Sequence, residues 1–126
     1  MELYEFFKSV IDMDTSAVVI CDLSHKTIYM NPAAAKRYEK RGGYSLVGKS
    51  LLDCHNKESC VKIKRVLEWF GKSEENNIVY TSYNEKENKD VYMVALRDGE
   101  KKLIGYYEKH DYRNRETADY YAPLSE

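Results

Sequence analysis

The sequence lacks any apolar run approaching the about 18 residues that a membrane-spanning helix needs. Its N-terminus also lacks the basic start and the long apolar core of a signal peptide. Cysteine is scarce and odd in number, unlike the even sets that staple small secreted domains. Because reduced thiols are typical of a reducing compartment, we expect a soluble, cytoplasmic protein with no membrane partner.

An excess of charge of one sign is absent as well. The 126 residues contain 20 Lys+Arg against 21 Asp+Glu, which argues against a protein that binds nucleic acid over its whole surface. This length suits one domain of about 100–150 residues and excludes a two-domain enzyme. The balance is not uniform, because residues 36–65 contain nine Lys/Arg against three Asp/Glu.

Hydrophobic periodicity and turn signals divide the chain into helices and strands. Apolar residues from position 3 to 11 follow the spacing of one helix face, Asn31-Pro32 is a strong helix start, and Asp98-Gly99 is typical of a hairpin turn. The patterns predict helices over 3–12, 31–40 and 56–71, and strands over 17–21, 27–30, 77–84, 90–97 and 102–109.

This order predicts an α+β fold, with a five-stranded sheet that carries helices over one face. We expect an N-terminal amphipathic helix over 1–13, a central domain over 14–113 and an irregular tail over 114–126, docked by its tyrosines. A concave space between the sheet and the helices is a usual place for a small ligand.

Two stretches resemble the PAS sensor family. The sequence AVVICDLSHKTIYMNPAA, which begins at Ala17, resembles the family's opening hairpin and short helix, and GYSLVGKSL, which begins at Gly43, resembles the segment that follows. The resemblance covers about residues 14–113 and includes the closing three-stranded meander. It implies a ligand-binding or dimerising signal module with a PAS-like antiparallel sheet.

The letters from Gly43 to Ser50 also satisfy the phosphate-binding pattern G-x-x-x-x-G-K-[ST]. A phosphate-binding loop joins a buried strand to a helix, whereas here a predicted helix precedes the motif. We therefore interpret the segment as a turn between helices.

The most unusual local feature is Cys54-His55-Asn56, just before the predicted third helix. Imidazole and thiolate are axial ligands of haem iron, and the basic excess over 36–65 suits haem propionates. His55 is accordingly the candidate iron ligand of a haem-based redox or gas sensor. The alternative, which we favour, is that His55 and Asn56 lead into and cap the helix, with Cys54 and Cys60 as small core residues.

Other cofactors fit the cysteines less well. Structural zinc takes four ligands in short paired spacings, and C-x₅-C beside one histidine does not supply them. A redox disulfide between Cys54 and Cys60 needs a separation that two positions along one helix do not guarantee. Flavin photochemistry is disfavoured, because none of the cysteines lies in the Asn-Cys-Arg-Phe type of motif that the light-sensing PAS branch uses.

Pocket-lining positions are expected on the strands and on the third helix. Alternate strand residues share a face, so some of the closing-strand tyrosines should face the pocket, or else form cross-strand pairs or a dimer surface. Gly105 is interpreted as a position where backbone or a ligand approaches the strand closely, or as a bulge. The candidate ligand-binding residues are Ile28, Met30, Cys54, His55, Val66, Tyr80, Tyr92, Met93 and Tyr106.

We expect, from the resemblance, a sensory module that binds a small molecule and signals through a homodimer or a partner. Its output would lie in a separate protein or in a domain absent from these residues. The rival hypothesis is a ligand-free interaction module. An enzyme is not expected, since neither His25 nor His110 has the serine or cysteine partner of a nucleophilic site in the sequence pattern.

Overall fold

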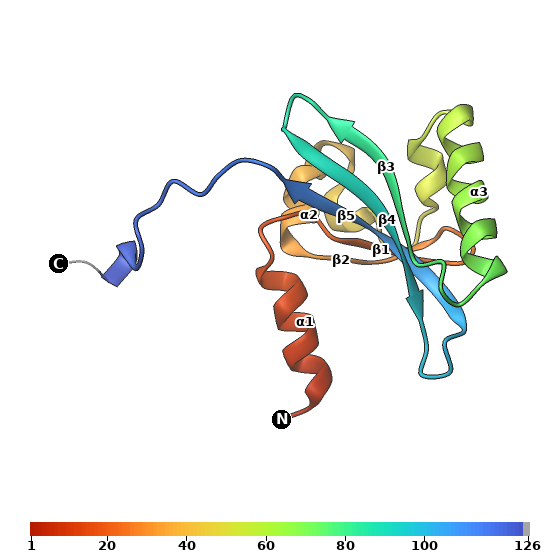
Figure 1. Ribbon diagram of the computed structural model, residues 1–126, viewed down its shortest axis with the longest axis horizontal. Helices are drawn as coiled ribbons and strands as arrows, with labels where there is room; N and C mark the ends of the chain where they lie inside the picture. Colours follow the sequence, from red (N-terminus) through yellow and green to blue (C-terminus); the bar gives the residue numbers. More distant parts are fainter. Residues whose placement is uncertain (125–126) are drawn as a thin grey trace.

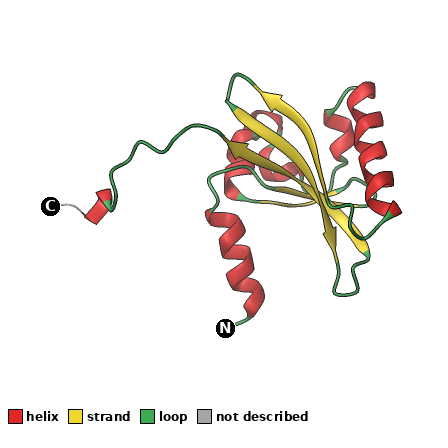
Figure 2. Ribbon diagram, viewed as in Figure 1, coloured by secondary structure: helices red, strands yellow, loops and turns green. Residues whose placement is uncertain are grey.

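Five strands form one antiparallel sheet in the computed structural model, which describes residues 1–124. Their order across the sheet is β2-β1-β5-β4-β3, and α2, α3 and the short helices between them lie on one side of it (Figures 1 and 2). The expected α+β architecture is therefore confirmed. The strands are β1 Val19–Asp22, β2 Thr27–Met30, β3 Ile78–Asn84, β4 Lys89–Arg97 and β5 Leu103–Tyr112; the α-helices are α1 Leu3–Met13, α2 Pro32–Arg37 and α3 Lys57–Lys72.

Asn31 fixes the start of α2 and joins it to the chain before it. Its side-chain oxygen accepts hydrogen bonds from the backbone N–H groups of Ala34 and Val18, both at 2.9 Å. Its amide nitrogen donates to the carbonyls of Ile11 at 2.9 Å and Ser16 at 3.0 Å. This buried side chain thus ties α1 and the residue just before β1 to α2 as well as capping a helix.

The helix predicted over 31–40 is shorter than expected. α2 ends at Arg37, and a 3₁₀-helix, Glu39–Arg41, continues the segment. Two further 3₁₀-helices, Gly43–Leu46 and Leu51–Cys54, lead to α3. The predicted glycine stop holds for this 3₁₀-helix, which ends at Arg41 and is followed by Gly42 and Gly43, both with positive φ.

The lysine-containing part of the G-x-x-x-x-G-K-[ST] motif runs beside edge strand β2. The Gly48 N–H donates to the Thr27 carbonyl at 2.7 Å, and the Thr27 N–H donates to the Lys49 carbonyl at 2.9 Å. The motif therefore covers the edge of the sheet with its backbone, and it is preceded by short helices rather than by the buried strand that a phosphate-binding loop requires.

α3 covers the sheet with the apolar stripe expected from its sequence. Asn56 caps its N-terminus by accepting from the Ser59 N–H at 2.8 Å. Phe70 is fully buried in a core cluster with Cys21, Met93 and Tyr106. Partly buried side chains surround this cluster, namely Val19, Leu51, Ile63, Val66, Leu67, Val79, Ala95 and Leu103.

Both ends of the described chain lie at the surface. α1 contains no buried residue and projects away from the sheet (Figure 1). The tail over 114–126 lies partly outside the described residues, and in its described part Tyr120 and Tyr121 are exposed, so the expected docking by these tyrosines is wrong. Among residues 1–124, no helix is both long enough and apolar enough to cross a membrane.

Candidate functional site

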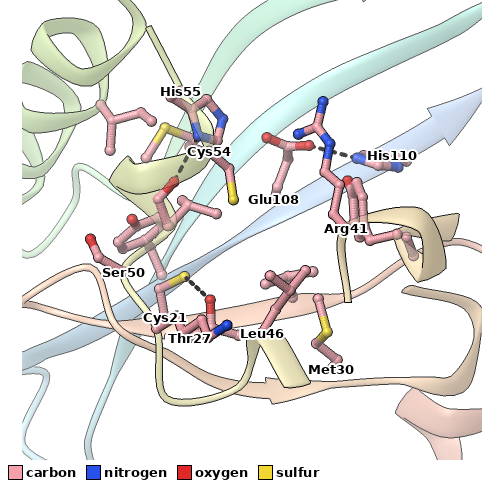
Figure 3. Close-up of a pocket in the computed structure, with 18 residues that line it drawn as sticks. Cys21, Thr27, Met30, Arg41, Leu46, Ser50, Cys54, His55, Glu108 and His110 are labelled. Carbon is pink, nitrogen blue, oxygen red and sulfur yellow. Dashed lines mark hydrogen bonds and ion pairs between the residues drawn. The ribbon is translucent and has the colours of Figure 1, made fainter. Parts of the chain in front are cut away.

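A cavity of about 210 Å³ lies between the inner face of the sheet and the layer formed by α2, the 3₁₀-helices and α3 (Figure 3). Apolar side chains make up most of its wall, and polar groups such as Ser50, His55 and Glu108 lie among them. The lining residues are Ala17, Val19, Cys21, Thr27, Met30, Tyr38, Arg41, Leu46, Lys49, Ser50, Leu51, Cys54, His55, Ile63, Met93, Tyr106, Glu108 and His110.

Five of the nine candidate residues from the sequence line this cavity. Met30 comes from β2, Met93 from β4 and Tyr106 from β5, while Cys54 and His55 come from the segment just before α3. Residues separated by more than seventy positions in the sequence therefore share one wall.

Ile28 and Val66 do not line the cavity. The pairing of β1 with β2 shifts by one residue, so that Thr27 pairs with Cys21 and Tyr29 with Ile20, and Ile28 is left exposed at the bulge. Val66 packs against the Phe70 core cluster.

Tyr80 and Tyr92 also lie away from the cavity. Met93 points into it, so the preceding residue Tyr92 faces the opposite side of β4. Tyr80 pairs with Tyr92 across the two strands, with ring centroids 5.2 Å apart, and its hydroxyl donates to Asp90 at 2.7 Å. These tyrosines form a cross-strand pair, which is the alternative to a pocket-facing position that the sequence left open.

His55 is held in a defined orientation at the edge of the cavity. Its Nδ1 lies 2.8 Å from the carbonyl oxygen of Leu51, and its other ring nitrogen points to the side where Glu108 and Arg41 lie (Figure 3). A carbonyl only accepts, so Nδ1 carries the proton and Nε2 of the neutral ring is an acceptor. A metal-ligating histidine is commonly fixed in this way.

The cysteines are free thiols. Cys54 is exposed, whereas the Cys60 thiol donates to the Leu52 carbonyl at 3.4 Å. Cys21 is buried, and burial raises the pKa of its thiol, which keeps it protonated and a weak nucleophile. Within residues 1–124, no three His, Cys, Asp or Glu side chains come together as a metal site, although Cys54, His55, Glu108 and His110 line the same cavity.

Sequence reasoning missed the polar wall that β5 contributes. Glu108 and His110 follow Tyr106 at alternate positions, so all three face the cavity. The His110 Nε2 lies 2.8 Å from the Glu108 carboxylate, and Nδ1 lies 3.3 Å from the Nζ of Lys89, which is 1% exposed. Strand alternation counted from Tyr106 would have placed Glu108 and His110 on the cavity side of β5. No pattern in the sequence indicates that Lys89 is buried.

The polar network continues from the cavity to α2. Lys89 Nζ lies 3.3 Å from the Glu87 carboxylate, which accepts two hydrogen bonds from Arg37 at 2.6 and 2.7 Å. The hydrogen bonds from Arg37 lower the pKa of Glu87 to about 2. A chain of charged and polar groups thus joins the cavity wall to the surface ion pair between α2 and the β3–β4 turn.

On the other side of the cavity, Tyr106 is fixed by a contact with the β1–β2 turn. Its hydroxyl lies 2.9 Å from Nδ1 of His25. Burial raises the pKa of the Tyr106 phenol and lowers the pKa of His25. Both groups are therefore neutral at physiological pH. They hold this part of the wall in place and add no charge to the cavity.

Neither a protein-family model nor a curated protein sequence matches the chain. Solved structures do match. The C-terminal domain of a Streptococcus mutans protein is 20% identical over 85% of this chain and 82% of that chain, with a TM-score of 0.65. A PAS domain from Colwellia psychrerythraea is 13% identical over 87% and 96% of the two chains, with a TM-score of 0.63.

A third similar structure is the Aer2 receptor of Vibrio cholerae, described as a dual PAS-heme oxygen sensor. It is 17% identical over 75% of this chain and 90% of that chain, with a TM-score of 0.54. Identities this low establish the fold and leave the ligand open. The chain therefore has a PAS-like fold, as its opening hairpin and closing meander predicted.

Proposed function

We propose that the chain is a PAS-type sensory module that binds a small molecule in the cavity between the sheet and α3. The observation that carries the proposal is a cavity of about 210 Å³ with a mostly apolar wall and with polar groups, His55 and Glu108, fixed by hydrogen bonds. An apolar cavity of about 150 Å³ accommodates benzene, so this one has room for a substituted ring. An interaction module without a ligand would be expected to fill this space with side chains.

A binding experiment with a matched pair of variants tests the proposal. Ile63 lines the cavity, whereas Val61, on the same helix, is exposed. We expect ethylbenzene to bind saturably to the unmodified protein and to Val61→Trp, and to lose binding in Ile63→Trp, where the indole fills the cavity. Native mass spectrometry of freshly purified protein would identify a ligand that co-purifies. If ethylbenzene does not bind and no added mass is found, the ligand-free interaction module becomes the better hypothesis.

Signalling would pass through a homodimer that uses α1. One face of this helix exposes Leu3, Phe6, Phe7 and Val10, and a contiguous apolar surface of this kind is typical of an interface. The outer face of the sheet offers a second apolar row, because Ile20, Tyr107, Val94 and Ile78 are cross-strand neighbours. A change in the cavity wall would reach this row through β4 and β5, which contribute to both faces.

Sedimentation velocity tests the dimer. Phe6→Ser removes an aromatic ring from the apolar face, whereas Glu5→Ser changes the opposite face of the same helix. We expect the unmodified protein and Glu5→Ser to sediment as dimers and Phe6→Ser to sediment as a monomer. Equal sedimentation of all three would contradict a dimer formed by this face. In either case, the signalling output would run through a separate partner or through a domain outside these residues.

Haem is a second candidate ligand, favoured by the orientation of His55. Nδ1 is held by the Leu51 carbonyl, so Nε2 has its lone pair available for iron. The cavity is smaller than the about 300–1,000 Å³ of usual ligand sites, so a porphyrin needs the segment before α3 to move outward. Titration with hemin tests the idea: we expect a Soret shift that His55→Ala abolishes and His25→Ala retains. The same shift in His55→Ala would eliminate His55 as the ligand.

A further inference from the structure

The hydrogen bonds of His110 determine what Glu108 offers to the cavity. An ammonium group can only donate, so Lys89 donates to Nδ1 of His110 across 3.3 Å. The ring proton is therefore on Nε2, which donates to Glu108 across 2.8 Å. Lys89 and His110 are both buried, so the contact between them is shielded from water, whereas the Glu108 side chain is 46% exposed.

Glu108 consequently faces the cavity as an ionised acceptor. Burial alone would raise the pKa of its carboxyl, but the hydrogen bond from His110 and the nearby basic groups His110, His55 and Lys89 lower that pKa below its ordinary value. The His110 bond uses one carboxylate oxygen. Within residues 1–124, the other oxygen has no hydrogen-bond donor, although the carboxylate lines the cavity.

His55 presents a second acceptor to the same space. Its Nδ1 is engaged with the Leu51 carbonyl, which leaves the lone pair of Nε2 without a donor among the described residues. The cavity thus holds two acceptors, each fixed by a bond to the protein, and a bound molecule has to supply the donors. Fixed groups lose little conformational entropy on binding, which favours them as recognition elements.

We infer that the cavity binds a small molecule with an apolar body that presents N–H donors, as an amidine or an amine does, to Glu108, with His55 as the second acceptor. This inference rests on the proposed ligand-binding function and names the chemical class of the ligand. An amidinium is the best match for a carboxylate, because the two make parallel charge-assisted hydrogen bonds.

Arg41 and Lys49 define the competing class of ligand, an organic anion. Both line the cavity and both are exposed, and neither side chain has a hydrogen bond or an ion pair among residues 1–124. Ordering such long, hydrated side chains around a carboxylate costs conformational entropy that the fixed acceptors do not lose. The structure therefore favours donors over an anion, and the experiment compares the two directly.

Three probes of nearly the same shape separate the classes: benzamidine, benzoate and ethylbenzene. Benzamidine carries N–H donors and positive charge, benzoate carries acceptors and negative charge, and ethylbenzene has neither. Chemical-shift titrations of the full chain at neutral pH would give the three dissociation constants. We expect benzamidine to bind at least about tenfold more tightly than benzoate, with the largest shifts at the amides around Glu108 and Met93.

A conservative variant then tests whether the N–H donors of benzamidine bind to Glu108. Glu108→Gln keeps the shape of the side chain and removes its charge, and Asp111→Asn makes the same change on β5 at a residue outside the cavity. We expect Glu108→Gln to weaken benzamidine by about tenfold or more and to leave ethylbenzene within about twofold, with no effect of Asp111→Asn. A well-dispersed spectrum shows that each variant is folded. The comparison of the three probes on the unmodified protein tests the ligand class without any variant.

The outcomes separate this inference from the proposed function. Tighter binding of benzoate than of benzamidine would overturn the inference and point to Arg41 and Lys49. Equal binding of all three probes would also overturn it, while leaving a ligand-binding cavity in place. If none of the three binds, the proposed function fails together with the inference.

Discussion

Replacing Asn31 with alanine is the sharpest test of how the fold is held together. The side chain is completely buried, and its amide makes four hydrogen bonds of 2.9–3.0 Å, two as an acceptor and two as a donor. The partners are the backbone groups of Val18, Ala34, Ile11 and Ser16. No other side chain in the hydrogen-bond pattern of residues 1–124 joins α1, the residue before β1 and α2 at one point.

The expected loss of stability follows from this count. Each hydrogen bond contributes about 1 kcal/mol net, and a buried backbone group left without a partner costs at least as much, so Asn31→Ala should lower the free energy of unfolding by about 4 kcal/mol. Domains of this size are stable by only about 5–15 kcal/mol. Asn56 is the matched control, since it caps α3 from an exposed position with one bond, to Ser59, and its replacement by alanine should cost about 1 kcal/mol.

Urea unfolding followed by the fluorescence of Trp69, the one tryptophan, measures both variants. Comparable losses for Asn31→Ala and Asn56→Ala would refute the reasoning, because they would reduce Asn31 to an ordinary helix cap. Asn31→Asp adds a second check. Its carboxylate keeps the two acceptor contacts but loses the two donors and buries a charge, so we expect it to be at least as unstable as the alanine variant.

Two further predictions concern the sheet and its acid stability. Alanine at Gly105 would place its Cβ against the backbone carbonyl of Cys21 and force β1 and β5 apart, so urea unfolding should show a loss of about 1–3 kcal/mol, whereas Gly99→Ala meets open space and should be neutral. Glu87 has an ordinary pKa of 4.5 and a folded pKa of about 2, so its contribution to stability is complete above pH 4.5 and is lost as pH falls toward 2. Acid unfolding of Arg37→Gln should lack this dependence, and an unchanged acid transition would contradict it.

The order of the elements could be predicted from the sequence because each has a local signal. Asn31-Pro32 begins a helix at the predicted position, and the apolar stripe of α3 faces the sheet. The 3₁₀-helices before α3 were not predicted, since the chain there is held by backbone bonds such as that from Gly48 to Thr27, which leave no side-chain pattern.

The candidate site was predictable only as far as strand alternation could be counted correctly. Met93 and Tyr106 line the cavity, whereas Tyr92 is one residue out of phase and Ile28 falls at a bulge. A shift of one residue turns a strand side chain to the other face of the sheet. Such shifts depend on pairing between strands, which a single strand's sequence does not contain.

The basic excess over 36–65 shows why a charge count along the chain is a poor guide to a ligand. It suggested an anion, yet only Arg41 and Lys49 of the nine basic residues reach the cavity, and both are exposed. The charge that is fixed at the cavity wall belongs to Glu108, far along the sequence, and it is set by the buried pair Lys89 and His110. The hydrogen bond from His110 fixes this carboxylate in place, whereas Arg41 and Lys49 have no such partner among residues 1–124. The carboxylate is therefore the better-ordered charge for selecting what binds.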